Sequence, residues 1–370
     1  MKKISVAEPS IGKKEIEYVT RAVKSGWVSS RGEFIEEFET AFAAFCGVKR
    51  AVSTSNGTCA LHLVLLALGI GPGDEVIVPT LSFVATANAV TYTGAKPAFA
   101  DVDAACWCIT AEEIEKRITP RTKAIMVVHL YGHPADMAAI GKVARKHKLL
   151  LIEDAAEAHG AVCRGKVVGG LSDAAVFSFY GNKILTTGEG GMVTTNSRKL
   201  ADKIHFLKNH GMDPRRRYWH PEVGYNYRMT NLHAALGVAQ LERVDEFLAQ
   251  KRKIIGWYRN ALDEKLVQLQ VEMPWAVSAW WMVSVLVKGC AGEERRNAII
   301  AALAKRGIET RPLFYPMHFF PMYSRSAPKG GLPVSEKLYK MGINLPSGVK
   351  LRKNDVAYVA ECLHSILAYH

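Results

Sequence analysis

The sequence lacks any long run of apolar residues. No stretch approaches the roughly 18 apolar residues that a membrane-spanning helix needs. The segment from Met1 to Gly12 carries two lysines but no apolar run of signal-peptide length. We therefore expect neither a membrane span nor an export signal, and we place the protein in the cytoplasm.

Cysteines and glycine-rich nucleotide motifs are also scarce. The 7 cysteines are scattered and odd in number, and the closest pair is Cys106-Trp-Cys108 rather than Cys-x-x-Cys, which indicates reduced thiols and no metal site. Neither Gly-x-x-x-x-Gly-Lys-Ser/Thr nor Gly-x-Gly-x-x-Gly occurs at an expected strand-to-helix turn. The sequence therefore argues against a P-loop and against a Rossmann dinucleotide site.

The remaining composition is that of an ordinary globular protein with an excess of positive charge. The 370 residues are 49% hydrophobic and 22% charged, and the formal net charge is +13. Such a charge favours anionic partners, which include nucleic acid, anionic lipid and phosphorylated small molecules. The densest basic run, Arg215 to Arg217, is too short for a nucleic-acid stripe with interleaved aromatics, so we expect no nucleic-acid partner.

Between about residues 50 and 195, short apolar segments alternate with amphipathic ones. The expected strands are 50–55, 75–79, 96–101, 123–130, 149–154, 174–179 and 191–195, and the expected helices between them are 58–68, 83–92, 111–118 and 137–148. This alternation is typical of a mainly parallel sheet with helices on both faces. In such sheets ligands bind at the carboxyl ends of the strands, where Asn56, Thr80, Asp154 and Ser178 fall.

The later part of the chain has a different pattern. A long helix is expected over 231–255, followed by a strand over 280–287 and a helix over 293–306. We predict an α/β protein with a large domain, residues 1–244, and a smaller C-terminal α+β domain, residues 245–370.

Two residues indicate the chemistry. Lys183 lies in a turn between two apolar strands, where burial lowers the pKa of a lysine and leaves a free amine that can attack an aldehyde and move a proton. Asp154 ends the apolar strand 149–154, where a protonated pyridine nitrogen would neutralise its charge. Both features predict pyridoxal phosphate. The alternative for Asp154 is to cap a helix over 155–159.

Two further segments suit the same cofactor. Asn56-Gly57-Thr58 lies where a strand turns into a helix, and backbone N–H groups at a helix N-terminus bind phosphate. Phe83 is expected to open the helix 83–92 at the same edge of the sheet, where an aromatic ring can stack on a flat cofactor. An ordinary capped turn and a core aromatic remain the alternatives.

Five motifs in order carry a resemblance. These are Asn-Gly-Thr at 56, Pro-Thr-x-Ser-Phe at 79, Glu-Asp-Ala-Ala-Glu-Ala-His-Gly-Ala at 153, Ser-Phe-Tyr-Gly-Asn-Lys-x-x-Thr-Thr-Gly-Glu-Gly-Gly at 178 and Gly-Tyr-Asn-Tyr-Arg-Met-Thr-Asn-Leu at 224. Over nearly its whole length the chain resembles the DegT/DnrJ/EryC family of sugar-nucleotide aminotransferases, which have the fold of type I pyridoxal-phosphate enzymes.

The resemblance implies a role for each of these positions. Lys183 would bond to the cofactor aldehyde, Asp154 would hold the pyridine nitrogen, and Phe83 would stack on the ring. Family members are homodimers with shared active sites. The other expected cofactor contacts are Gly57, Thr58 and Ser178 at the phosphate, Glu157 beside the cofactor, and Asn226 from the other subunit.

Within the family, the chain most resembles members that transfer an amino group from L-glutamate to GDP-4-keto-6-deoxy-D-mannose, giving GDP-perosamine. Among the segments that carry this likeness are Arg217-Tyr-Trp-His-Pro221 and Arg311-Pro-Leu-Phe-Tyr-Pro-Met-His318. They suggest Arg217, Arg311 and His318 as substrate contacts, with loop and packing roles as the alternative. Trp280-Trp281 departs from the usual Tyr-Trp. A UDP- or dTDP-linked keto-sugar remains an alternative substrate, and a non-catalytic regulator that binds pyridoxal phosphate remains an alternative function.

Overall fold

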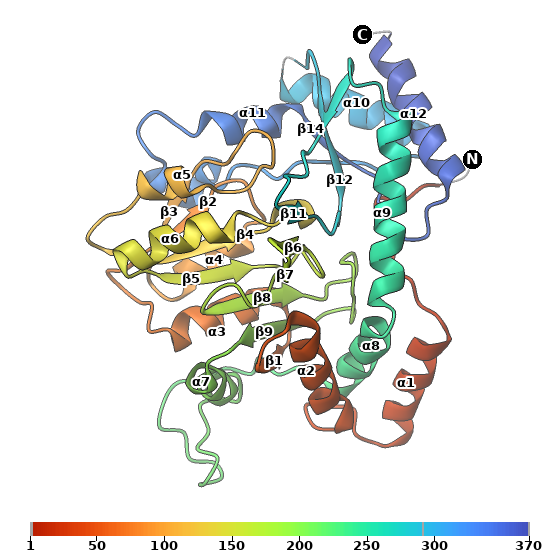
Figure 1. The fold of residues 1–370 in the computed structure, drawn as a ribbon. Helices are drawn as coiled ribbons and strands as arrows, with labels where there is room; N and C mark the ends of the chain where they lie inside the picture. The colour runs from red at the N-terminus through yellow and green to blue at the C-terminus, as the bar shows by residue number, and fades with distance from the viewer. Residues whose placement is uncertain (1–2, 291, 369–370) are drawn as a thin grey trace.

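A seven-stranded sheet forms the centre of the protein (Figure 1). The computed structural model describes residues 3–290 and 292–368. The strands of this sheet are β1 (Arg50–Thr54), β2 (Glu75–Pro79), β3 (Lys96–Ala100), β4 (Thr122–Val128), β5 (Leu150–Asp154), β8 (Ala174–Ser178) and β9 (Gly191–Thr195). Their order is β1-β9-β8-β5-β4-β2-β3, and β9 runs antiparallel to both neighbours while the other pairs are parallel.

Each strand of the sheet lies within two residues of its predicted bounds. The strands are apolar throughout because both faces are covered: Val76 and Val78 pack into one core cluster, while Ile77 between them packs into another. The prediction of a mainly parallel α/β sheet is therefore confirmed.

Helices cover the two faces of the sheet. Residues of α3, α4 and α7 share one core cluster, and residues of α2, α6 and α8 share the other. The helices up to this point are α1 (Lys13–Lys24), α2 (Glu33–Cys46), α3 (Gly57–Ala67), α4 (Ala85–Tyr92), α5 (Ala111–Glu115), η1 (Leu130–Gly132), α6 (Met137–His147), α7 (Arg198–Lys208) and α8 (Asn231–Leu241). A helix-covered sheet of this kind presents the carboxyl ends of its parallel strands to a ligand.

The single helix predicted over 231–255 is wrong, because the structure contains two helices. The helix α8 ends at Leu241, and α9 (Val244–Ala261) begins after a break at Arg243. The Arg243 side chain binds the N-terminal segment there, donating to Glu15 Oε1 at 2.8 Å and to the Ser10 carbonyl at 3.2 Å. Figure 1 shows α9 running from α8 toward β12, β14 and α12, away from the large sheet.

A second sheet and its own core lie at the far end of α9 (Figure 1). Its strand order is β10-β12-β14-β13, and a third core cluster joins it to α9, α10 and α12. The remaining elements are β6 (Val162–Cys163), β7 (Lys166–Val167), β10 (Val267–Leu269), β11 (Ala276–Val277), β12 (Val283–Val287), α10 (Glu293–Lys305), β13 (Arg311–Pro312), η2 (Met317–Phe319), η3 (Pro321–Ser326), α11 (Pro333–Met341), β14 (Gly342–Leu345) and α12 (Lys353–Ala368).

Ile4 also packs into this third cluster, next to Ile308. The proposed division at residues 244 and 245 stays a prediction, and the N-terminal segment contacts both parts of the molecule. No helix formed by residues 3–290 or 292–368 combines the length and the apolar character needed to cross a bilayer.

Candidate active site

Lys183 lies in a tight turn between β8 and β9. Its backbone N–H donates to the Tyr180 carbonyl at 2.9 Å, and the turn closes where Phe179 N–H donates to the Gly190 carbonyl at 2.9 Å. Glycine is required here because a Cβ on Gly191 would lie 2.5 Å from the Asn56 carbonyl. The sequence between the two strands therefore fixes where the lysine emerges, and its side chain is only 12% exposed.

The Lys183 amine contacts an acid and an aromatic ring. Its Nζ lies 3.6 Å from Glu157 Oε1 and 3.7 Å from the centroid of the Trp281 ring. Burial lowers the pKa of Lys183, and the charges of Glu157 and Asp154 oppose this effect. The structure thus holds a buried amine whose neutral, nucleophilic form is favoured relative to a surface lysine.

Glu157 occupies a buried position next to this amine. Its Oε2 accepts a hydrogen bond of 2.8 Å from the backbone N–H of Tyr131, a residue with a φ of 56°. Burial raises the pKa of Glu157 to about 7, although the nearby Lys183 charge acts in the opposite direction. A carboxyl group with this pKa can exchange a proton near neutral pH.

Asp154 is buried at the carboxyl end of β5. The alternative role for Asp154, capping a helix over 155–159, does not apply, because the backbone forms turns there. Asp154 Oδ2 accepts from the Thr86 hydroxyl at 2.8 Å and Oδ1 accepts from Ala156 N–H at 3.2 Å. Burial raises the pKa of Asp154. Each oxygen keeps a free lone pair for a cationic partner.

The start of α3 meets the end of β8. Asn56 caps this helix by accepting from Cys59 N–H at 2.9 Å. The N–H groups of Gly57 and Thr58 come before the first hydrogen bond of the helix, which Ala60 N–H donates to the Asn56 carbonyl, so they have no partner within the helix. A Cβ on Gly57 would lie 2.9 Å from the Ser178 Cβ, which shows how closely the two segments approach. Backbone N–H groups at Gly57 and Thr58 and the Ser178 hydroxyl fit a phosphate group.

Phe83 lies at the same edge of the sheet, between β2 and α4. It precedes the helix rather than opening it, because α4 begins at Ala85. The Phe83 side chain is 56% exposed, and its ring centroid lies 5.9 Å from that of Phe314. An exposed ring supported on one side by a second ring can stack on a flat ligand.

Residues 9–364 match the DegT/DnrJ/EryC1/StrS aminotransferase family. The chain belongs to this family. This aminotransferase is 50% identical to the GDP-perosamine synthase of Caulobacter vibrioides, over 99% of this chain and 98% of that protein.

Two other similar proteins give the same picture. This aminotransferase is 48% identical to the GDP-perosamine synthase of Escherichia coli O157:H7, over 98% of both chains. Among solved structures, a putative sugar aminotransferase of Streptococcus pneumoniae in its PMP form has a TM-score of 0.94, with 27% identity and coverage of 100% of this chain and 98% of that one. The expected family and the expected fold are therefore confirmed.

The three predicted substrate contacts lie in different surroundings. Arg217 is exposed beside the Tyr218 hydroxyl, and Arg311 is exposed and paired with Glu309 at 3.1 Å. His318 is buried, with Nδ1 2.8 Å from the Thr80 hydroxyl and Nε2 3.3 Å from Glu336. The His318 ring therefore joins two segments of this chain, which favours the packing role.

Part of the segment between α7 and α8 projects away from the body of the molecule (Figure 1). Asn226 lies at the base of this segment, where it forms a bridge with Asn209 just after α7, and the next residue, Tyr227, accepts a hydrogen bond from Ser55 N–H at 2.9 Å. The Asn226 side chain is exposed, and its Oδ1 accepts from Arg228 Nη2 at 3.0 Å. Asn226 is therefore an exposed polar residue on the surface of the body, next to the end of α7.

Three residues of the site did not follow from the sequence motifs. Thr86 binds Asp154, Tyr131 binds Glu157 through its N–H, and Trp281 covers the Lys183 amine. The only signal for Thr86 was its place one helical turn after Ser82, with which its hydroxyl also bonds at 3.0 Å. No local pattern pointed to Tyr131 or to the contact of Trp281 with Lys183, because both depend on the packing of distant segments.

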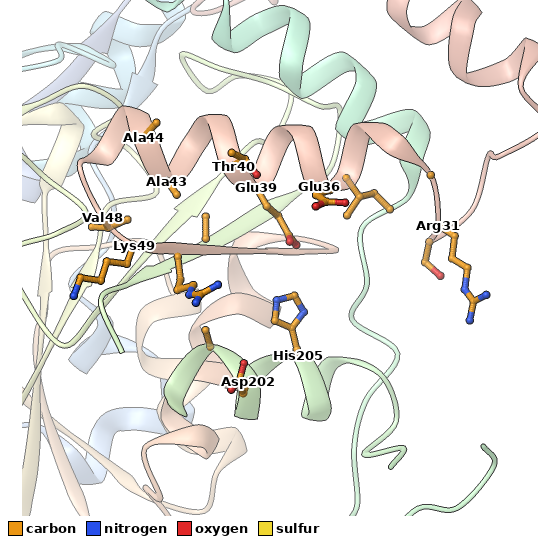
Figure 2. Close-up of a pocket in the computed structure, with 16 residues that line it drawn as sticks. Arg31, Glu36, Glu39, Thr40, Ala43, Ala44, Val48, Lys49, Asp202 and His205 are labelled. Atoms are coloured by element: carbon orange, nitrogen blue, oxygen red, sulfur yellow. The ribbon is translucent and has the colours of Figure 1, made fainter. Parts of the chain in front are cut away.

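A cavity of about 760 Å³ is lined by other residues than these (Figure 2). It is an open groove between α2, β1 and α7, with Glu39, Asp202 and His205 among its lining residues. None of the predicted site residues lines it. Its walls carry both signs of charge, and nothing in it resembles the lysine and aspartate pair at the edge of the sheet.

Proposed function

We propose that Lys183 and Asp154 form the catalytic centre of this aminotransferase and that it uses pyridoxal 5'-phosphate. The observation that carries the proposal is the convergence at one edge of the sheet of a buried amine on Lys183, a buried carboxylate on Asp154 and the N-terminus of α3 beside Ser178. When bound, pyridoxal phosphate provides an aldehyde that bonds to amines and a ring that accepts electrons from a carbanion.

The residues of this chain would hold the cofactor at three points. Gly57, Thr58 and Ser178 would bind the phosphate through backbone N–H groups and a hydroxyl. Asp154 would keep the pyridine nitrogen protonated, since a buried carboxylate gains from a cationic partner. Phe83 would stack on the ring.

Lys183 would then act as the acid and base of the reaction. Its Nζ takes a proton from the amino-bearing carbon of the donor in one half-reaction and delivers a proton to the acceptor carbon in the other. Glu157 lies 3.6 Å from this nitrogen and would hold or release a proton as the charge of the amine changes. Ping-pong kinetics would follow, because the keto acid formed from the donor leaves before the keto-sugar reacts.

The proposed substrates are L-glutamate and GDP-4-keto-6-deoxy-D-mannose, with GDP-perosamine as product. The support is the full-length similarity, at 50% and 48% identity, to two proteins named GDP-perosamine synthase. Arg217 and Arg311 are proposed contacts of the anionic diphosphate. A contact of His318 with the substrate would require its bonds to Thr80 and Glu336 to break. The competing substrates are UDP- or dTDP-linked keto-sugars.

We also propose that two copies of the chain share their active sites. Asn226 from one copy would then reach the phosphate site of the other. Several apolar side chains near α1, including Ile16, Val23 and Trp27, are exposed in the single chain and would be covered in such a dimer.

A spectroscopic assay tests cofactor, donor and acceptor together. The purified protein with pyridoxal phosphate is expected to show a visible absorbance band that glutamate bleaches and that GDP-4-keto-6-deoxy-D-mannose restores. Lys183→Ala should lose both the band and turnover. Recovery with UDP- or dTDP-linked keto-sugars but not with the GDP sugar would overturn the substrate assignment, and binding without bleaching would favour a non-catalytic regulator.

A further inference from the structure

The free amine of Lys183 has an aromatic face as a direct partner. Its distance of 3.6 Å from Glu157 Oε1 exceeds that of an ordinary hydrogen bond. The centroid of the Trp281 ring lies 3.7 Å from Nζ. This separation is well within the range in which an ammonium group is attracted to an indole face.

Trp281 is itself held from several directions. Its Nε1–H donates to the carbonyl of Asn182 at 2.8 Å, and its own carbonyl accepts from Lys251 Nζ at 2.8 Å. Its ring lies nearly parallel to that of Tyr131, with an angle of 20° and 6.2 Å between centroids. The indole cannot turn away from Lys183 without breaking its bond to the residue that precedes this lysine.

The backbone around Trp281 is also fixed by a close approach. A Cβ on Gly132 would lie 2.7 Å from the Trp280 nitrogen and 2.8 Å from the Trp281 nitrogen, so only glycine permits this contact. The residue before it, Trp280, faces the opposite way and packs in the third core cluster with its ring under Arg259. The two tryptophans therefore serve different parts of the molecule.

We propose that Trp281 is a positioning residue that holds the protonated amine of Lys183 beside the reacting atoms, from the moment it takes up a proton until it delivers one. The inference rests on the proposed function, in which the lysine is released and taken back in each half-reaction. A lysine side chain has many rotamers, and an unheld amine would leave the reacting carbon.

The ring also acts selectively on one protonation state. The negative face of an indole attracts an ammonium ion and has little attraction for a neutral amine. Trp281 therefore opposes the burial that lowers the pKa of Lys183. Loss of the ring should increase the fraction of neutral amine at a given pH.

A matched pair of substitutions tests this role. The variants are Trp281→Phe and Trp281→Leu, and the control is Trp280→Phe, whose indole nitrogen has no hydrogen-bond partner among the described residues and so loses none. Each full-length protein, freed of cofactor, is labelled with trace acetic anhydride over a range of pH. Mass spectrometry of the Lys183 peptide then gives the pH at which labelling is half-maximal, and circular dichroism checks the fold.

The expected midpoint for Lys183 moves to lower pH in Trp281→Leu, by less in Trp281→Phe, and not at all in Trp280→Phe. At a pH below the midpoint, the neutral fraction in Trp281→Leu should rise about tenfold. An unchanged midpoint in both Trp281 variants, or an equal change in Trp280→Phe, would overturn the proposal. If Trp281→Leu does not fold, Trp281→Phe against Trp280→Phe decides.

Turnover of the unsubstituted enzyme is measured in parallel. A midpoint change in Trp281→Leu together with wild-type turnover supports both the position of the amine and the proposed function. The same change without wild-type turnover supports the contact but contradicts the proposed function. Wild-type turnover with no midpoint change contradicts the role of Trp281 alone.

Discussion

Lys251 offers a quantitative test of how the site is supported. It is fully buried on α9, and its Nζ donates to the carbonyls of Trp281 at 2.8 Å and Ser347 at 2.6 Å. Burial alone lowers the pKa of Lys251 from 10.5 to about 7. The folded protein therefore binds this proton more weakly than the unfolded chain does.

The sign of the effect follows from proton linkage. Between pH 7 and 10.5 the unfolded chain binds more protons at this position, so stability rises with pH over this interval. The full interval corresponds to about 5 kcal/mol of unfolding free energy, of which about 2 kcal/mol falls between pH 7 and 9. In Lys251→Met this contribution disappears.

The assay is urea unfolding of the cofactor-free wild type and variant at pH 7, 8 and 9. The difference in unfolding free energy, wild type minus Lys251→Met, should rise by about 2 kcal/mol across this range. Lys253→Met, on the exposed side of the same helix, is the control and should follow the wild type. A difference that stays constant with pH would refute the argument, because Lys251 would then titrate alike in the folded and unfolded chains.

Four further outcomes are expected. Lys183→Ala should lower turnover more than about a thousandfold with an unchanged circular dichroism spectrum, since the acid and base of both half-reactions is removed. Thr86→Val should weaken pyridoxal phosphate binding about tenfold in an absorbance titration, because Asp154 loses a hydrogen bond. Gly57→Ala should weaken the same binding at least as much, since the new Cβ would lie 2.9 Å from the Ser178 Cβ. The raised pKa of Glu157 means that the folded wild type binds a proton that it loses as pH rises through about 7, so its unfolding free energy should fall by about 3 kcal/mol between pH 4.5 and 7. In Glu157→Gln this fall should be absent, as measured by urea unfolding of the cofactor-free proteins.

The sequence by itself determined the central sheet and the ends of its strands. Apolar segments that alternate with amphipathic ones fix the seven strands of the central sheet, and the glycines after Lys183 fix the turn that carries it. Asp154 and Ser178 could be placed at one edge because parallel strands in such a sheet end together. These are local patterns, and local propensity and periodicity are sufficient to predict them.

Only the tertiary structure decided which side chains surround the lysine. Trp281 is far from Lys183 along the chain, yet its ring contacts the Lys183 amine. Its backbone is held by the hydrogen bond from Lys251 on α9 and by the close approach to Gly132, where a Cβ would clash. The break at Arg243 that redirects α9 likewise depends on the N-terminal segment bound there. Such contacts depend on the packing of segments that are distant in sequence. A local pattern of residues therefore does not predict them.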